Sequence, residues 1–197
     1  MADVNVKEYV RSLVQRAKAA QKEFERTATD QLTIDKVVRA VGKTIYDHRE
    51  ELAKDACEET KYGTVEMKIN KILASTPGQW NVMRGKKSVG YIANLRDEPG
   101  VKVMAKPMGV VGCVMPSTNP IVTIAANGMM SIKCRNACII APHPSAKNVS
   151  KKTVASLTVS ELTLTSASCA FGSYFDFCIA GASVGFWVMT IAPSLST

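Results

Sequence analysis

Two apolar runs with one helix-length segment between them constrain the fold of this 197-residue chain more than any other feature. Residues 110–115 (VVGCVM) and 137–141 (ACIIA) show no alternation of apolar and polar side chains. Strands buried on both faces have this pattern, and such strands are typical of parallel sheets. Residues 120–133, which lie between the two runs, have the length of a crossover helix. We therefore predict two adjacent parallel strands joined by a helix, which is the start of a doubly wound α/β domain.

The first 75 residues have a helical hydrophobic period instead. Apolar side chains recur there at steps of three and four residues, which predicts four helices. The expected helices cover residues 6–24, 30–45, 49–61 and 65–73. Thr29 or Asp30 is the expected N-cap of the second helix, and Gly63 the expected stop of the third. The period changes near Pro77, so we expect a helical N-terminal layer that ends before the sheet begins.

A hairpin is expected between the helices and the sheet. Residues 88–94 and 101–106 read as strands, and the sequence DEPG between them, residues 97–100, reads as a turn. An exposed strand edge is a pairing surface unless it is covered. We therefore expect residues 88–106 to protrude and to pair with another subunit in a homo-oligomer.

The charge of the chain is unevenly distributed. The net charge is +8, but all 25 Lys and Arg residues lie at or before Lys152, whereas residues 155–197 contain none. The basic residues alternate with Glu and Asp, and no aromatic cluster offers a stacking platform, so we expect solvated helix faces and no nucleic-acid partner. The six cysteines show no CxxC spacing and the N-terminus is charged and amphipathic, which favours a reduced cytoplasmic protein without a metal site.

Both strands of the predicted sheet end in proline-containing corners. Ligands of open parallel sheets bind beyond the carboxyl ends of the strands, where both corners must lie. Asn119 stands immediately before Pro120, so it can cap the crossover helix or present its amide NH₂ to a developing oxyanion. Ser117 and Thr118 are common turn residues, and His143 between two prolines is also typical of an ordinary surface loop. Taken one at a time, these residues leave the structural and the functional interpretation open.

Together the two corners resemble one family. The sequences KPMGVVGCVMPSTNP and SIKCRNACIIAPHPSAK are similar to the cofactor domain of aldehyde dehydrogenases, and specifically to the coenzyme-A-acylating branch. The resemblance covers about residues 6–152. Ordinary aldehyde dehydrogenases have Trp at the Ser117-Thr118 position, Lys at the position of His143, and a ribose-holding Glu at that of Ala146. All three departures favour the acylating branch.

The resemblance implies both a fold and a reaction. The fold is an incomplete Rossmann-like parallel sheet with a helical N-terminal layer. The reaction is the oxidation of a small aldehyde by NAD or NADP through a cysteine thioester, whose acyl group passes to coenzyme A. Asn119 matches the oxyanion-stabilising asparagine of the family. The residues that match cofactor-lining segments are Met115, Pro116, Ser117 and Thr118 at the nicotinamide end, and His143 and Pro144 beside the adenosine end.

The nucleophilic cysteine that the resemblance implies belongs to a downstream domain of the family, which this chain does not reach. Cys113 and Cys138 lie within the predicted strands, and Cys134 lies at the end of the crossover helix. We expect all three thiols to be buried and inert. A catalytic thiol must face Asn119 across a cleft, which a residue of the same sheet does not do.

The last segment of the chain does not resemble the family. We expect residues 1–154 to form the N-terminal part of an NAD(P)-binding domain, and residues 155–197 to form a divergent tail. The tail reads as out-of-frame translation, as a membrane segment over residues 170–193, or as a replacement that completes the sheet, in that order of preference. The predicted function is accordingly a truncated acylating aldehyde dehydrogenase, inactive alone. The alternative is a non-catalytic module for nucleotide binding or subunit interaction.

Overall fold

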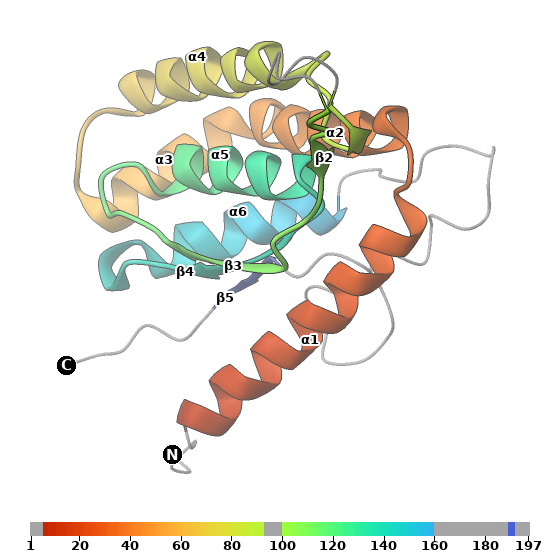
Figure 1. Cartoon of the computed structure of the whole chain (residues 1–197). Coiled ribbons are helices and arrows are strands. Elements are labelled where there is room, and N and C mark those ends of the chain that lie inside the picture. The colour runs from red at the N-terminus through yellow and green to blue at the C-terminus, as the bar shows by residue number, and fades with distance from the viewer. Residues whose placement is uncertain (1–5, 93–99, 160–188, 192–197) are drawn as a thin grey trace.

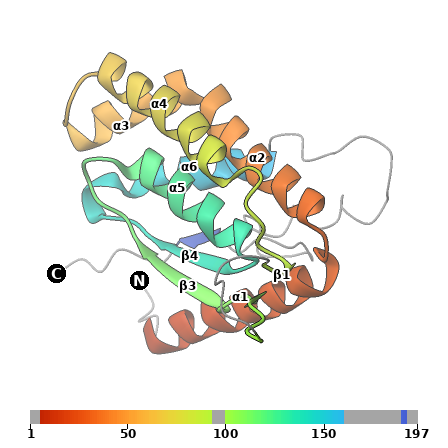
Figure 2. The same ribbon diagram turned by 45° about the horizontal axis from the view of Figure 1, so that its top comes forward.

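The computed structural model describes residues 6–92, 100–159 and 189–191, and in these a small parallel sheet separates one long helix from the other helices (Figures 1 and 2). The sheet has the order β3-β4-β5, formed by Val110–Val114, Ala137–Ala141 and Met189–Ile191. Strands β3 and β4 are parallel, with Val110 opposite Ala137 and Val114 opposite Ala141. Helix α5, Pro120–Lys133, is the crossover between them. The predicted strand-helix-strand unit is therefore confirmed, as is the α/β fold class.

The helical layer is also present. It consists of α1 (Val6–Thr27), α2 (Gln31–Asp47), α3 (Arg49–Thr60) and α4 (Val65–Met83). Asp30 is the N-cap of α2, where its carboxylate accepts a hydrogen bond from the Thr33 backbone N–H at 2.8 Å. The side-chain and backbone hydrogen bonds from Thr33 lower the pKa of Asp30. Helix α3 ends at Thr60, one residue before the predicted end, and its C-cap is Lys61 in the left-handed conformation (φ 59°); Gly63, the predicted stop, also has a positive φ (71°).

Helix α4 is ten residues longer than the prediction, which ended it at residue 73. It continues through Pro77 to Met83. The buried stripe Ile72, Thr76 and Met83 continues across the proline, with Trp80 packed against the same core. Packing against α2, α3 and α5 thus outweighs the hydrogen bond that a proline removes from a helix.

The expectation that both faces of the two strands are buried is correct for β4 but wrong for β3. One face of the sheet is covered by α5, whereas the other is covered by α1 only near the start of the strands. There Ala17 and Ala20 of α1 pack against Ala137. Beyond this contact Val114 of β3 is 82% exposed, because α1 does not extend over it.

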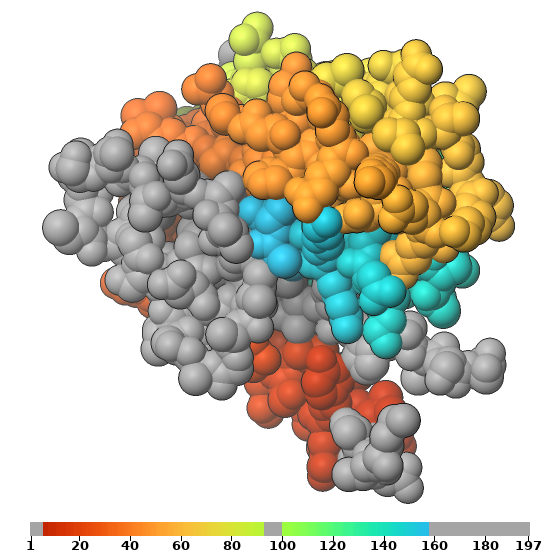
Figure 3. All heavy atoms as spheres, turned by 180° about the vertical axis from the view of Figure 1, so that it is seen from behind, coloured from red at the N-terminus to blue at the C-terminus, as the bar shows by residue number. Residues whose placement is uncertain are grey.

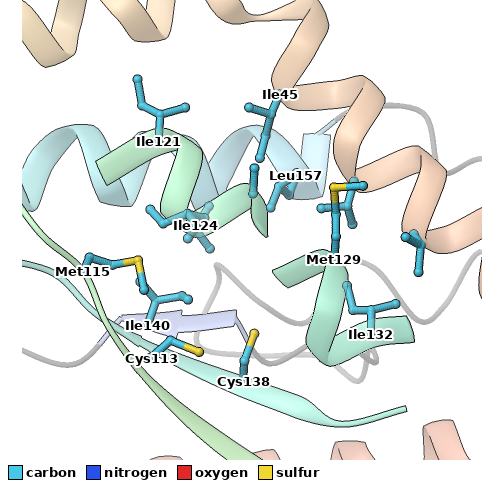
Figure 4. Close-up of a cluster of buried hydrophobic side chains, with 14 of the residues drawn as sticks. Ile45, Cys113, Met115, Ile121, Ile124, Met129, Ile132, Cys138, Ile140 and Leu157 are labelled. Carbon is cyan, nitrogen blue, oxygen red and sulfur yellow. The ribbon is translucent and has the colours of Figure 1, made fainter. Parts of the chain in front are cut away.

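The core lies between the sheet and the helices on one side of it, and α5 makes the contact with the strands (Figure 4). Cys113, Met115, Cys138 and Ile140 project from the strands toward this helix. The side chains that meet them include Ile121, Ile124, Met129 and Ile132 of α5. Burying a side chain of this size contributes about 1.5–3 kcal/mol, so this contact fixes α5, and with it the corner at its N-terminus.

The hairpin is present in short form. Strands β1 (Gly90–Tyr91) and β2 (Met104–Ala105) pair antiparallel, and the backbone N–H of Ile92 donates to the Val103 carbonyl at 2.8 Å. The predicted turn lies mostly outside the described residues. Pairing of the hairpin with a second subunit stays a prediction.

The tail contributes β5, which pairs parallel with β4. Its other residues from 160 onward lie outside the described part of the chain. The predicted domain boundary at residue 154 falls within α6, Lys147–Val159. No helix in the described residues has the length and apolar character that crossing a bilayer requires.

The sequence Arg135-Asn136-Ala137, part of the family-like motif, has a structural role. The side-chain carbonyl of Asn136, a buried residue, accepts hydrogen bonds from the backbone N–H groups of Met108 and Gly109, at 2.7 and 2.9 Å. Arg135 has a left-handed backbone (φ 58°), and its carbonyl accepts from the Gln21 side chain of α1 at 3.2 Å. These bonds join the starts of β3 and β4 and attach α1 to them.

We predict that Asn136→Ala destabilises the chain by about 1–3 kcal/mol, because two backbone donors lose their acceptor. Urea unfolding followed by circular dichroism measures this change. Asn70→Ala, at an exposed position of α4, is the control and should change stability by less than about 0.5 kcal/mol. Equal effects of the two substitutions would contradict the structural role of Asn136.

Candidate functional site

The carboxyl edge of the sheet brings the two predicted corners together. They are residues 116–120 after β3, the β3 corner, and residues 142–144 after β4, the β4 corner. The backbone N–H of Met115, just after β3, donates to the carbonyl of Ala141, the last residue of β4, at 2.9 Å. From this shared point one chain segment leads to the N-terminus of α5 and the other to a 3₁₀ turn, Pro144–Ala146, and α6. The site is therefore an edge bordered by two helix starts.

The predicted cofactor-lining residues are not equally accessible. The exposed ones are Pro116, Thr118, His143 and Pro144, whereas Ser117 is half-buried. Met115 is only 1% exposed and belongs to the core, so its side chain has no free surface for a ligand. A bound molecule could meet only the backbone at that position.

Asn119 occupies the N-cap position of α5, but its side chain makes no capping hydrogen bond. Its backbone carbonyl accepts from the N–H of Thr123 at 3.2 Å and from the Thr123 hydroxyl at 2.8 Å. The side-chain oxygen Oδ1 accepts instead from Nζ of Lys71, on α4, at 3.0 Å. The purely structural interpretation of Asn119 as a side-chain cap is therefore not what the structure shows.

Two lysines of α4 reach the β3 corner, and the sequence analysis missed both. Lys68 Nζ donates to the carbonyl of Thr118 at 3.3 Å, and Lys71 bonds Asn119. The residues are three apart and so share one helix face. Burial lowers the pKa of Lys68; the nearby charge of Lys71 lowers it further, whereas Cys57 raises it. The corner therefore lies beside two ammonium groups, which favour negative charge there.

The second corner carries a carboxylate. Glu59 of α3 accepts hydrogen bonds from the backbone N–H groups of Asn148 and Val149 in the first turn of α6, at 2.8 and 2.6 Å. Figure 3 shows α2 and α3, in orange, directly against α6, in blue. Ala146, in the turn before α6, is fully buried. The α6 start is thus already occupied by an anionic group, and an incoming phosphate would have to compete with Glu59.

His143 is held in one ring orientation at this corner. Its Nδ1 accepts from the Ser145 backbone N–H at 3.2 Å and lies 2.8 Å from the Ser145 hydroxyl. In the neutral ring the proton is therefore on Nε2, because a nitrogen that accepts a hydrogen bond carries none. The imidazole is exposed and can donate from Nε2 to a ligand at the edge.

None of the three cysteines that the sequence offers as nucleophiles has its thiol at the β3 corner. Cys113 and Cys138 are buried as predicted, and a hydrogen bond with Cys138 lowers the pKa of Cys113 while burial raises it. The prediction for Cys134 is wrong: it is exposed, because it is the C-cap of α5, where the chain turns. At roughly 1.5 Å per residue, the length of α5 places it about 20 Å from Asn119.

A pocket of about 280 Å³ lies between α2 and α4, but its lining includes none of the corner residues. Its lining residues are Arg39, Gly42, Lys43, Tyr46, Asp47, Thr76, Pro77 and Trp80. Within the described ranges, no group of three or more His, Cys, Asp or Glu side chains is placed to hold a metal ion.

Comparison with known proteins decides the family. A sequence model of the aldehyde dehydrogenase family matches residues 3–161. The chain belongs to the aldehyde dehydrogenase family. This match includes both corners, α4 with its two lysines, and α6.

Individual relatives give the same result. The acetylating succinate-semialdehyde dehydrogenase of Clostridium kluyveri is 44% identical over 146 residues, covering 73% of this chain and 31% of that protein. An acetylating aldehyde dehydrogenase structure from Geobacillus thermoglucosidasius is 34% identical, with a TM-score of 0.73 over 80% of this chain and 35% of the other. The Rhodopseudomonas palustris propionaldehyde dehydrogenase, solved with bound propionyl-CoA, is 26% identical, with a TM-score of 0.61 over 75% and 32%. The chain thus spans about a third of the length of these aldehyde dehydrogenases.

Proposed function

We propose that this aldehyde dehydrogenase chain provides the N-terminal part of the cofactor domain of an NAD(P)-dependent, coenzyme-A-acylating enzyme. Its substrate is a small aldehyde, and the nucleophilic thiol comes from a further segment of the family architecture. The observation that carries the proposal is Asn119, whose amide lies at the carboxyl edge with its oxygen bonded to Lys71. The acetylating relatives and the relative solved with propionyl-CoA support the acyl transfer.

In this mechanism Asn119 acts when a thiolate has attacked the aldehyde and the carbonyl oxygen has become negative. The Nδ2 group then donates a hydrogen bond to that oxygen, and the nearby charge of Lys68 adds to its stabilisation. Because the negative charge exists only after attack, these groups lower the barrier more than they strengthen substrate binding.

The exposed corner residues fit a dinucleotide at this edge. Pro116 and Thr118 are exposed beside Asn119, and His143 offers a donor nitrogen at the second corner. NAD(P)⁺, when bound, accepts the hydride of the aldehyde carbon. The Glu59 carboxylate at the α6 start suits ribose hydroxyls better than a pyrophosphate, so we place the phosphates away from that helix end.

A second candidate function is a non-catalytic module for nucleotide binding or subunit interaction. The observation that favours it is β5, since the tail supplies a third strand to the sheet. Such a module would bind the dinucleotide but would depend on no thiol for its role.

We also propose that the hairpin mediates homo-oligomerisation, because Tyr91 and Met104 on its two strands are about half exposed. Light scattering of the full chain should give a mass above the 21.3 kDa monomer, and Tyr91→Lys should shift the population toward the monomer. A monomer at all concentrations would contradict this proposal.

The substitution Asn119→Asp distinguishes a catalytic from a structural role of this residue. The test uses a chimera in which the matched segment of this chain replaces its counterpart in the Clostridium kluyveri relative. In this chimera, Asn119→Asp should lower kcat by about 10²–10³, or roughly 2.7–4 kcal/mol, because a carboxylate cannot donate to an oxyanion. NADH absorbance with saturating aldehyde and coenzyme A measures kcat.

Stability is the control for this substitution. The melting temperature should be nearly unchanged, because Asn119 makes no side-chain cap and an aspartate can still accept from Lys71. Loss of a side-chain cap would instead cost about 1 kcal/mol of stability and leave the rate per folded molecule intact. A near-normal kcat for Asn119→Asp would exclude the oxyanion role.

A further inference from the structure

We infer that Lys71 is a positioning residue, which orients the Asn119 amide so that its NH₂ group is the end left free for the oxyanion. The inference rests on the proposed oxyanion role of Asn119 and adds a residue 48 positions away in the sequence.

The orientation follows from hydrogen-bond chemistry. An ammonium group has three donors and no acceptor, so the amide atom facing Lys71 must be the oxygen. With Oδ1 bonded to Lys71 at 3.0 Å, Nδ2 occupies the opposite end of the amide. No side chain or backbone group among the described residues accepts from Nδ2. A freely rotating amide would present its oxygen to the reaction centre part of the time, and an oxygen repels an oxyanion.

The packing of α4 fixes the backbone from which the exposed Lys71 side chain reaches Asn119. Ile72, the next residue, is fully buried in the core, and the Thr76 hydroxyl donates to its carbonyl at 2.8 Å. One turn earlier Lys68, only 8% exposed, donates to the Thr118 carbonyl. Helix α4 therefore contacts two successive residues of the corner, and its position relative to α5 is fixed by packing as well as by these bonds.

If Lys71 acted on the oxyanion through its charge alone, the expected result would differ. Charge acts on the oxyanion whether or not Asn119 is present, so the effects of removing Lys71 and Asn119 would multiply. A positioning residue acts only through Asn119, so its removal should have no further effect once Asn119 is gone. The double variant therefore distinguishes the two roles.

The first experiment uses the full chain. In a ¹⁵N-edited NMR spectrum, the Asn119 side-chain NH₂ pair is the pair that disappears in Asn119→Asp. Lys71→Met should shift this pair more than any other asparagine pair, whereas Lys71→Arg, which keeps a cationic donor, should leave it close to its original position. Lys54→Met, at an exposed lysine of α3, should not move it. An Asn119 pair unmoved by Lys71→Met would overturn the inference.

The second experiment measures turnover in the chimera described above. Lys71→Met should lower kcat about 10- to 100-fold, the effect expected from losing a hydrogen bond to a charged group, with little change in KM. Lys71→Arg should recover most of the rate, and Asn119→Ala/Lys71→Met should be no slower than Asn119→Ala. Multiplying effects, or a normal rate for Lys71→Met beside a slow Asn119→Ala, would overturn the positioning role alone. A normal rate for Asn119→Ala would instead overturn the proposed function on which it rests.

Discussion

The packing of α5 on the β3–β4 strand pair is the contact on which the rest of the structure depends. Met115 and Ile140 on the sheet meet Ile124 and Met129 of the helix in a core with very little solvent exposure. A helix fixed in this way has a fixed N-terminus, and here that terminus is Asn119. The corner is therefore as rigid as the core beneath it, which a preorganised donor requires.

Helices α3 and α4 then give the carboxyl edge its charges. Both reach this edge from outside the sheet, and they bring groups of opposite sign: Lys68 and Lys71 at the β3 corner, Glu59 at the β4 corner. The helical layer thus does more than cover the core. It makes one corner suitable for a developing anion and the other for hydroxyl donors, on a sheet whose own side chains there are neutral.

Local chemistry explains which elements the sequence predicts well. Pro120 at the first helical position and the apolar runs on either side give α5 and β4 the predicted boundaries. The prediction ended α4 too early because it treated Pro77 as a helix breaker. In the structure the buried stripe Ile72, Thr76 and Met83 continues across the proline and outweighs it. The exposure of Val114 depends on how far α1 extends across the sheet, which no local pattern encodes.

The candidate site also combines residues that the local sequence reveals with residues that only tertiary packing brings in. Asn119 and His143 can be found from their places after two strands, and the family resemblance assigns them roles. Lys71 and Glu59 cannot be found in this way, because their partners are 48 and 89 residues distant and the contacts depend on tertiary packing. The spacing of Lys68 and Lys71 on one helix face was visible, but it is equally typical of a solvated face.

The most direct test of the account is whether this segment works as the cofactor-domain part of an acylating aldehyde dehydrogenase. The chimera with the Clostridium kluyveri relative should reduce NAD(P)⁺ in a reaction that requires an aldehyde and forms the acyl-CoA product, measured by absorbance and by mass spectrometry. A chimera that folds with the relative's circular dichroism spectrum and melting behaviour and keeps its reactive thiol, yet forms no acyl-CoA, would contradict the account.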